Sequence, residues 1–304
     1  MCGIVGVVGN SNAVDILIQG LEKLEYRGYD SAGIYVTDAP DKGCLVKSVG
    51  RIADLRAKIS SDVKGSTGIG HTRWATHGQA TEDNAHPHTS ETGRFVLVHN
   101  GVIENYLQIK EEYLQGHKFK GQTDTEIAVH LIGKFVDEDG LSVLEALKKS
   151  LHIIQGSYAF ALVDSQAPDT IYVAKNKSPL LIGVGEGYNM VCSDAMAMIR
   201  ETSQFMEIHD KELVVLTKDA ITVTDYEGNA IERGTYTAEL DLSDIGKGTY
   251  PYYMLKEIDE QPTVMRKLIS TYADDEGNIT VDPAIVKSVQ EADRIYILAA
   301  GTSY

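Results

Sequence analysis

Strand-like segments come in clusters along this chain, and the helix-like segments lie between clusters rather than after each strand. A parallel sheet needs a crossover, usually a helix, between neighbouring strands, so this order favours stacked antiparallel sheets flanked by helices. The expected strands are Ile4–Val8, Ala32–Val36, Gly68–Trp74, Phe95–Val98, Tyr158–Val163, Thr170–Ala174, Leu181–Val184 and Leu213–Leu216. The expected helices are Ala13–Leu24, Tyr106–Leu114, Glu126–Val136 and Ser142–Ile153.

A polar, glycine-containing stretch, LDLSDIGKGTYP, interrupts this pattern at residues 240–251. We therefore expect one domain over residues 2–239, a linker over 240–251, and the start of a second domain over 252–304. The chain is long enough for such a division.

The segment after the linker has a different pattern. Residues 252–269 are expected to form a helix with a break at Pro262, and PAIVKSVQEA (283–292) is expected to form another. The final RIYILAAGTSY (294–304) predicts a strand that runs into a Gly-Thr-Ser turn. This is typical of the first strand of a parallel α/β sheet, cut short after its first loop.

Charge and cysteine content exclude several classes of protein. A formal net charge of −16 makes nucleic acid and anionic membrane surfaces poor partners. The three cysteines, Cys2, Cys44 and Cys192, are odd in number and have no CxxC spacing, which argues against a disulfide framework or a zinc site. With no signal peptide and no apolar run of membrane-spanning length, we expect a cytoplasmic protein without a metal or cofactor.

Cys2 precedes the buried strand-like run IVGVV, an unusual position for a reactive residue. A thiolate nucleophile needs a base, and no histidine is tied to Cys2 by a recognisable local signature. Removal of Met1 would leave Cys2 with a free α-amine of pKa ~8, which can act as that base. The alternative is a cysteine that falls at this position by chance.

The segment HTRWATHG (71–78) follows a strand and places Arg73, Thr76 and His77 around Trp74, the only tryptophan. Its structural interpretation is a polar strand end with a half-buried indole. Its functional interpretation is a clamp for a carboxylate, because guanidinium matches carboxylate geometry and a hydroxyl and an imidazole complete the set.

VHNGVIEN places Asn100 and Gly101 between a β-branched strand and a helix. An Asn-Gly turn is the simple interpretation. The functional alternative is a pair of oxyanion donors, the Asn100 side-chain N–H and the Gly101 backbone N–H, and one such donor is worth ~3 kcal/mol in a transition state.

Asp124 follows Thr123, which with Glu126 predicts a capping box at the start of an amphipathic helix. An acid in a first helical turn already suits the helix dipole, but Asp124 is also placed to receive a substrate ammonium. A nucleophile, oxyanion donors, a carboxylate clamp and an ammonium acceptor together describe hydrolysis of the side-chain amide of an α-amino acid, and glutamine fits.

Two further segments receive no catalytic role from spacing. LEYRGYDSAG (24–33) predicts a glycine-flanked turn that carries Arg27, Tyr29 and Asp30. In NAHPH, His86 and His88 are expected to be hydrogen-bonded in a loop rather than to bind a metal.

The segments MCGIVG, LEYRGYDSAG, HTRWATHG, AHPH, VHNGVIEN and TDTE closely resemble the N-terminal glutaminase of the glutamine–fructose-6-phosphate aminotransferase family. KEIDEQP and ILAAGTSY resemble the start of the sugar isomerase domain of that family. LEYRGYDSAG and HTRWATHG in this order are specific, whereas CGI alone also fits related amidotransferases.

This resemblance implies an α+β fold of the N-terminal nucleophile hydrolase type, a four-layer αββα sandwich with two antiparallel sheets, followed by a truncated α/β isomerase domain. It also implies that Cys2 attacks the glutamine amide while Asn100 and Gly101 hold the oxyanion. Arg73, Thr76 and His77 would bind the substrate carboxylate and Asp124 its ammonium. Trp74 would lie on a mobile loop that closes over glutamine.

In the family, the isomerase half binds fructose 6-phosphate and forms the homodimer. Gly301, Thr302 and Ser303 have the chemistry of a phosphate-binding loop, but the rest of that site is missing. We therefore expect a shortened form of such an aminotransferase, which releases ammonia from glutamine without aminating a sugar. The alternatives are a glutaminase of another class II amidotransferase, such as the phosphoribosyl or asparagine-forming enzymes, and a non-catalytic glutamine- or sugar-phosphate-sensing module.

Overall fold

The computed structural model describes residues 2–75, 78–238, 250, 252–274 and 277–297. The chain divides into two compact units, Met1–Leu242 and Ser243–Tyr304. Apart from Tyr250, the expected linker over 240–251 lies outside the described residues, so the domain limits stay a prediction.

The first unit contains two antiparallel sheets. The larger sheet has eight strands in the order β14-β11-β9-β10-β1-β4-β2-β3, and the smaller has six in the order β13-β12-β8-β7-β6-β5. The strands of the larger sheet are β1 (Gly3–Val8), β2 (Ser31–Thr37), β3 (Cys44–Val49), β4 (Thr67–Arg73), β9 (Leu181–Val184), β10 (Asn189–Cys192), β11 (Gln204–Glu207) and β14 (Tyr236–Thr237). Those of the smaller are β5 (His88–Thr89), β6 (Phe95–Ile103), β7 (Gly156–Asp164), β8 (Ile171–Asn176), β12 (Glu212–Leu216) and β13 (Ile221–Asp225).

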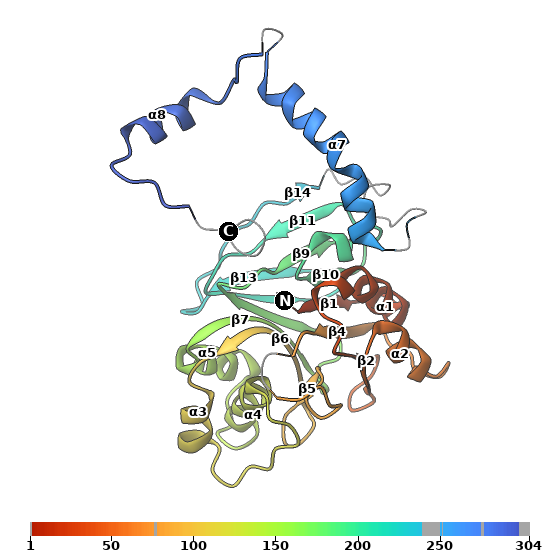
Figure 1. The fold of residues 1–304 in the computed structure, drawn as a ribbon. Coiled ribbons are helices and arrows are strands. Elements are labelled where there is room, and N and C mark those ends of the chain that lie inside the picture. Colours follow the sequence, from red (N-terminus) through yellow and green to blue (C-terminus); the bar gives the residue numbers. More distant parts are fainter. Residues whose placement is uncertain (1, 76–77, 239–249, 251, 275–276, 298–304) are drawn as a thin grey trace. The chain divides into compact units, whose positions relative to one another are not determined.

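Helices lie on the outer face of each sheet (Figure 1). The first group is α1 (Ala13–Leu24), which packs on β1 and β4, and α2 (Ile52–Lys58), which packs on β3. The second group is α3 (Tyr106–Tyr113), α4 (Asp124–Asp137) and α5 (Val143–Ile153), of which α4 packs directly on β6. The described part of the unit also contains two short 3-10 helices, η1 (Glu25–Arg27) and η2 (Ala195–Ala197).

Alternating side chains of β6 contribute to two separate cores. In β6, Val96 and Val98 belong to the core between the two sheets, whereas Phe95 and Leu97 belong to the core beneath α4 and α5. Successive side chains of a strand point to opposite faces, so an apolar run of this kind can fill both layers. The expected four-layer sandwich with two antiparallel sheets is therefore confirmed.

The expected helices and strands of this unit are present, with ends that differ by a few residues. Strands β3, β5, β10, β11, β13 and β14 and helix α2 were not among the expected elements. Most of the added strands are short or lie near a sheet edge, where the apolar pattern in the sequence is weakest.

The second unit contains α7 (Tyr253–Tyr272) and α8 (Pro283–Glu291). The expected break at Pro262 is wrong, because α7 continues through it. Proline removes one N–H donor to the carbonyl of Ile258, and that residue is exposed, so water can satisfy the carbonyl. The expected strand at the chain's end is also wrong for residues 294–297, which have no ladder partner among the described residues. No helix in the described parts of the chain is long and apolar enough to cross a membrane.

Candidate active site

The pairing of β1 with β4 places Cys2 beside the end of β4. Gly3 lies opposite Thr72 in this ladder, so Cys2 comes next to Arg73 and Trp74. The Trp74 backbone N–H donates to Cys2 Sγ at 3.2 Å. Burial raises the pKa of the Cys2 thiol, while this hydrogen bond and the nearby Arg73 charge act in the opposite direction. The thiol therefore needs a base to become a nucleophile at neutral pH.

Asn100 reaches Cys2 from the opposite sheet. Its Nδ2 donates to the Cys2 carbonyl oxygen at 3.0 Å, and its Oδ1 lies 3.0 Å from Nε2 of the buried His71. The same Nε2 lies 3.1 Å from the carbonyl oxygen of His99. Because both neighbours of Nε2 are oxygen acceptors, His71 carries its proton on that nitrogen. The amide of Asn100 is thus held in one orientation, and one of its two N–H groups remains for another acceptor.

Gly101 is not in a turn, which corrects the simple interpretation of the Asn-Gly pair. Both residues lie inside β6, where Gly101 is paired with Tyr158. Its φ of +137° is rarely adopted by residues with a side chain, and a Cβ there would lie 2.1 Å from the Ser157 carbonyl oxygen. Glycine is therefore required at this position, beside the Cys2 thiol.

Asp124 is the first residue of α4 and is 8% exposed. Its Oδ2 accepts the backbone N–H of Ile103, which fixes the carboxylate near the end of β6. The Thr123 hydroxyl caps the helix by accepting the Glu126 N–H. The expected capping box is only half formed, because the Glu126 carboxylate accepts the backbone N–H groups of Lys120 and Gly121.

Arg73 and Trp74 lie at the entrance of the site. The guanidinium of Arg73 donates to the carbonyl oxygens of Gln79 at 3.1 Å and Gly78 at 3.5 Å, so it faces the segment after β4. The Trp74 ring is 43% exposed and meets Tyr29 edge-on, with 5.5 Å between ring centroids. Thr76 and His77, the other expected carboxylate ligands, lie outside the described residues.

Spacing alone gave no role to the LEYRGYDSAG segment, but the structure places it against this loop. Asp30 Oδ2 accepts the backbone N–H of Ala75 at 2.8 Å. A Cβ on Gly28 would lie 2.7 Å from the Trp74 backbone nitrogen, so only glycine permits this close approach. Arg27 instead forms an ion pair with Asp194 at 2.7 Å. The signal that pointed to this contact was the pair of glycines flanking the turn.

Four buried histidines, His71, His86, His88 and His99, lie beneath the site. The rings of His71 and His86 stack with centroids 4.0 Å apart. Burial lowers the pKa of His71 to about 3 and that of His86 and His88 well below the ordinary value, so these rings are neutral at pH 7. His86 accepts the His99 N–H and His88 contacts the Thr123 hydroxyl, so both are hydrogen-bonded as expected.

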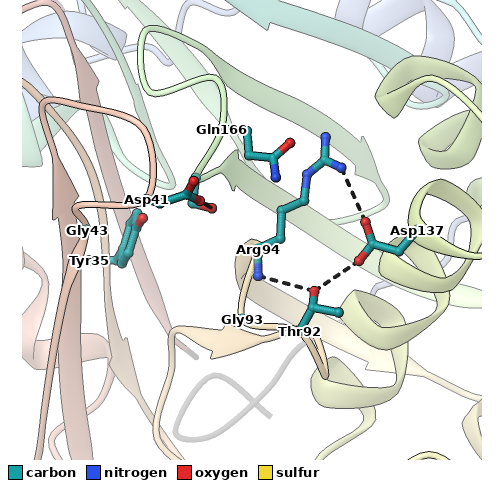
Figure 2. Close-up of a pocket in the computed structure, with 9 residues that line it drawn as sticks. Tyr35, Asp41, Gly43, Thr92, Gly93, Arg94, Asp137 and Gln166 are labelled. Atoms are coloured by element: carbon teal, nitrogen blue, oxygen red, sulfur yellow. Dashed lines mark hydrogen bonds and ion pairs between the residues drawn. The ribbon is translucent and has the colours of Figure 1, made fainter.

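The proposed catalytic and substrate-binding residues surround a small cavity of about 30 Å³. It is lined by Cys2, Arg73, Trp74, Gly101 and Asp124. Ligand pockets usually exceed ~300 Å³, so this cavity is smaller than a substrate with the size of glutamine needs. A larger cavity of about 470 Å³ lies near the β2–β3 hairpin (Figure 2). Its Arg94 is paired with Asp164 and Asp137, so the cavity offers no free cation to a substrate. Gly301, Thr302 and Ser303 lie outside the described residues.

Comparison with known proteins points to one group. A family model described as a glutamine amidotransferase domain matches residues 71–201. The chain is 84% identical over 304 residues to "Glutamine--fructose-6-phosphate aminotransferase [isomerizing]" of Streptococcus mutans serotype c, and 83% identical to the protein of that name from Streptococcus pyogenes serotype M1. Each alignment covers all of this chain and 50% of the relative, so the chain spans about half the length of these relatives.

Solved structures agree at the level of the fold. The glutamine phosphoribosylpyrophosphate amidotransferase from B. subtilis, complexed with ADP and GMP, is 29% identical with a TM-score of 0.65, over 75% of this chain and 50% of that one. A structure described as the allosteric regulatory enzyme of purine biosynthesis is 29% identical with a TM-score of 0.66, over 74% of this chain and 49% of that one.

Proposed function

We propose that Cys2 is the nucleophile that releases ammonia from L-glutamine in this chain, which belongs to the class II glutamine amidotransferases as a glutaminase part of the glutamine–fructose-6-phosphate aminotransferase family. One observation carries the proposal. Cys2, Gly101 and Asp124 line one cavity, and the Asn100 amide is hydrogen-bonded to Cys2 itself. This proximity supports the proposed roles of Cys2 as nucleophile, Asn100 and Gly101 as oxyanion donors and Asp124 as ammonium acceptor.

The reaction begins with attack of the Cys2 sulfur on the side-chain amide carbon. The α-amine of Cys2, freed by removal of Met1, takes the thiol proton, and the negative charge moves to the carbonyl oxygen. Asn100 Nδ2 and the Gly101 backbone N–H donate to that oxygen. The protonated amine then gives its proton to the departing nitrogen, which leaves as ammonia. Water hydrolyses the remaining thioester and releases glutamate, and Cys2 regains its proton.

Substrate charges select glutamine among amides. Arg73, together with Thr76 and His77, binds the α-carboxylate, and Asp124 binds the α-ammonium. This assignment is supported by the burial of both Arg73 and Asp124 and by their position in the lining of the same cavity. A desolvated charge-assisted hydrogen bond is worth more than an exposed one, so both contacts discriminate against amides that lack these groups.

In the longer protein, the ammonia converts fructose 6-phosphate to glucosamine 6-phosphate. The similarity to glutamine–fructose-6-phosphate aminotransferases supports this acceptor, and the length of those relatives leaves room for the isomerase part that binds it. Gly301, Thr302 and Ser303 contribute to its phosphate site, and that part forms the homodimer. Cysteines without disulfide spacing are consistent with action in the cytoplasm.

Ammonia release from glutamine alone tests the proposal, on protein whose N-terminus is mapped by mass spectrometry. We expect full activity only when Met1 is absent, and no activity in Cys2→Ala. The buried Cys192→Ala variant, which removes a thiol of β10 away from the site, is the matched control. Full activity in protein that keeps Met1 excludes the α-amine as base, and activity in Cys2→Ala excludes Cys2 as nucleophile.

A further inference from the structure

Two histidines and a glutamate meet beside the middle of α4. One ligand atom each from Glu91, His117 and His130 lies within 4.8 Å of the others. Glu91 precedes β6, His117 lies between α3 and α4, and His130 is in the middle of α4. The three residues thus come from three different segments of the chain that pack against one another. A cavity of about 70 Å³ lies among them, separate from the Cys2 site.

Both imidazole rings present an unsatisfied nitrogen in this cluster. The His130 ring is 2% exposed and the His117 side chain 10% exposed, and Nδ1 of each is buried without a hydrogen-bond partner among the described residues. His117 Nδ1 lies 2.8 Å from Glu91 Oε2, but not in hydrogen-bond geometry. Buried polar atoms in folded proteins nearly always have a partner, so the His130 nitrogen, together with a His117 nitrogen that has only the misaligned Glu91 carboxylate beside it, indicates a missing ligand.

The Nε2 atom of each ring has a carboxylate nearby, within hydrogen-bond distance for His117 but not for His130. His117 Nε2 lies 3.2 Å from Glu138 Oε1, and His130 Nε2 lies 4.0 Å from Glu126 Oε1. Histidines that bind metals commonly donate their other N–H to a carboxylate, which fixes the tautomer and leaves the remaining nitrogen free to bind. Lys134, which also lines the cavity, is paired with Asp139 at 2.7 Å, so its charge is balanced.

We propose that Glu91, His117 and His130 form a binding site for a divalent metal ion, with two Nδ1 atoms and one carboxylate oxygen as ligands. Two imidazoles and a carboxylate are the donor set of Zn²⁺, with a water molecule as the fourth ligand. The ion holds the segment between α3 and α4 against α4, close to the helix start that carries Asp124. Its role is structural, and the site does not depend on the proposed glutaminase reaction.

Zinc titration of chelator-treated protein in a Cys2→Ala/Cys44→Ala background tests the site, because these two partly exposed cysteines could bind zinc themselves. We expect one Zn²⁺ per chain, and a Co²⁺ complex with the visible absorption of a tetrahedral site. His117→Gln and Glu91→Gln should weaken the affinity by ~100-fold or more, and Glu138→Gln by ~10- to 100-fold. His152→Gln is the matched control, since His152 is exposed and bonds only the Lys148 carbonyl oxygen.

His130→Gln changes a fully buried residue, so its fold is checked by circular dichroism before titration. The less buried His117→Gln and Glu91→Gln decide the question if His130→Gln does not fold. Zinc that raises the melting temperature of the parent but not of His117→Gln supports the site. Zinc affinity that is equal in His117→Gln and the parent, or weaker than ~1 mM in the parent, overturns it.

Discussion

His71 holds the amide of Asn100 in place, with its Nε2 3.0 Å from Asn100 Oδ1. The histidine is in β4 of the larger sheet and the asparagine is in β6 of the smaller sheet. The orientation of a proposed oxyanion donor is therefore set by a contact across the sandwich. Because burial lowers the pKa of His71 to about 3, the ring stays neutral through the range in which the enzyme would work.

Replacing Asn100 by Ala should lower kcat by ~100-fold or more while KM changes little, because an oxyanion donor acts mainly in the transition state. His71→Leu should lower kcat by ~10-fold, since it frees the amide to rotate without removing it. Steady-state ammonia release measures both. A kcat unchanged in His71→Leu would show that other contacts fix the amide.

Gly101→Ala should destabilise the protein by ~3 kcal/mol or more, because the added Cβ would overlap the Ser157 carbonyl oxygen in a strand. Gly140→Ala is the control, since Gly140 has a φ of +72° but no atom within 4 Å of an added Cβ. Its cost should be only the ~1–2 kcal/mol of left-handed backbone. Urea unfolding measures both, and equal losses would contradict the close contact at Gly101.

Arg73→Ala and Asp124→Asn should each raise the KM for glutamine by ~100-fold, as expected when a desolvated charged contact is lost. Asp15→Asn is the matched control for Asp124, because Asp15 is an exposed acid in the first turn of α1. If Asp124→Asn behaves like Asp15→Asn, the carboxylate serves only the helix and the Ile103 N–H.

The Cys2 thiol should react with iodoacetamide more slowly at pH 8 than free cysteine, whose pKa is ~8.5, because burial raises the pKa of Cys2 and lowers the thiolate fraction. Arg73→Gln should move the pH midpoint of alkylation further up, since the arginine charge favours the thiolate. Protein that keeps Met1 is used, so that the α-amine of Cys2 does not titrate. Arg51→Gln, an exposed substitution, should leave the midpoint unchanged.

Trp74 should report closure of the segment that follows β4. Its partly exposed indole lines the cavity, so a segment that closes over bound substrate should change the exposure of the ring to solvent. As the only tryptophan, it gives an emission that can be assigned without ambiguity. A glutamine analogue that alkylates Cys2 should shift the emission saturably, and Arg73→Ala should abolish the response to glutamate. An unchanged spectrum at full Cys2 modification would show that the ring is fixed.

The sequence by itself determined the fold class and the set of candidate residues. Alternating and clustered apolar residues predict two antiparallel sheets because side-chain burial follows strand periodicity. Motifs such as VHNGVIEN and HTRWATHG identified Asn100 and Arg73 by their chemistry and family resemblance. Both inferences were possible because strand periodicity and motifs can be recognised within short segments of the sequence.

Only the tertiary structure decided how these segments meet. The ladder between β1 and β4 brings Cys2 to Trp74, and packing of the two sheets brings Asn100 to Cys2. Asp30 and His71 gained their roles in the same way, through contacts with residues distant along the chain. Local pattern favoured a turn at Asn100–Gly101, but long-range pairing with β7 extended the strand through both residues. Register and sheet packing are long-range properties, so a local pattern does not contain them.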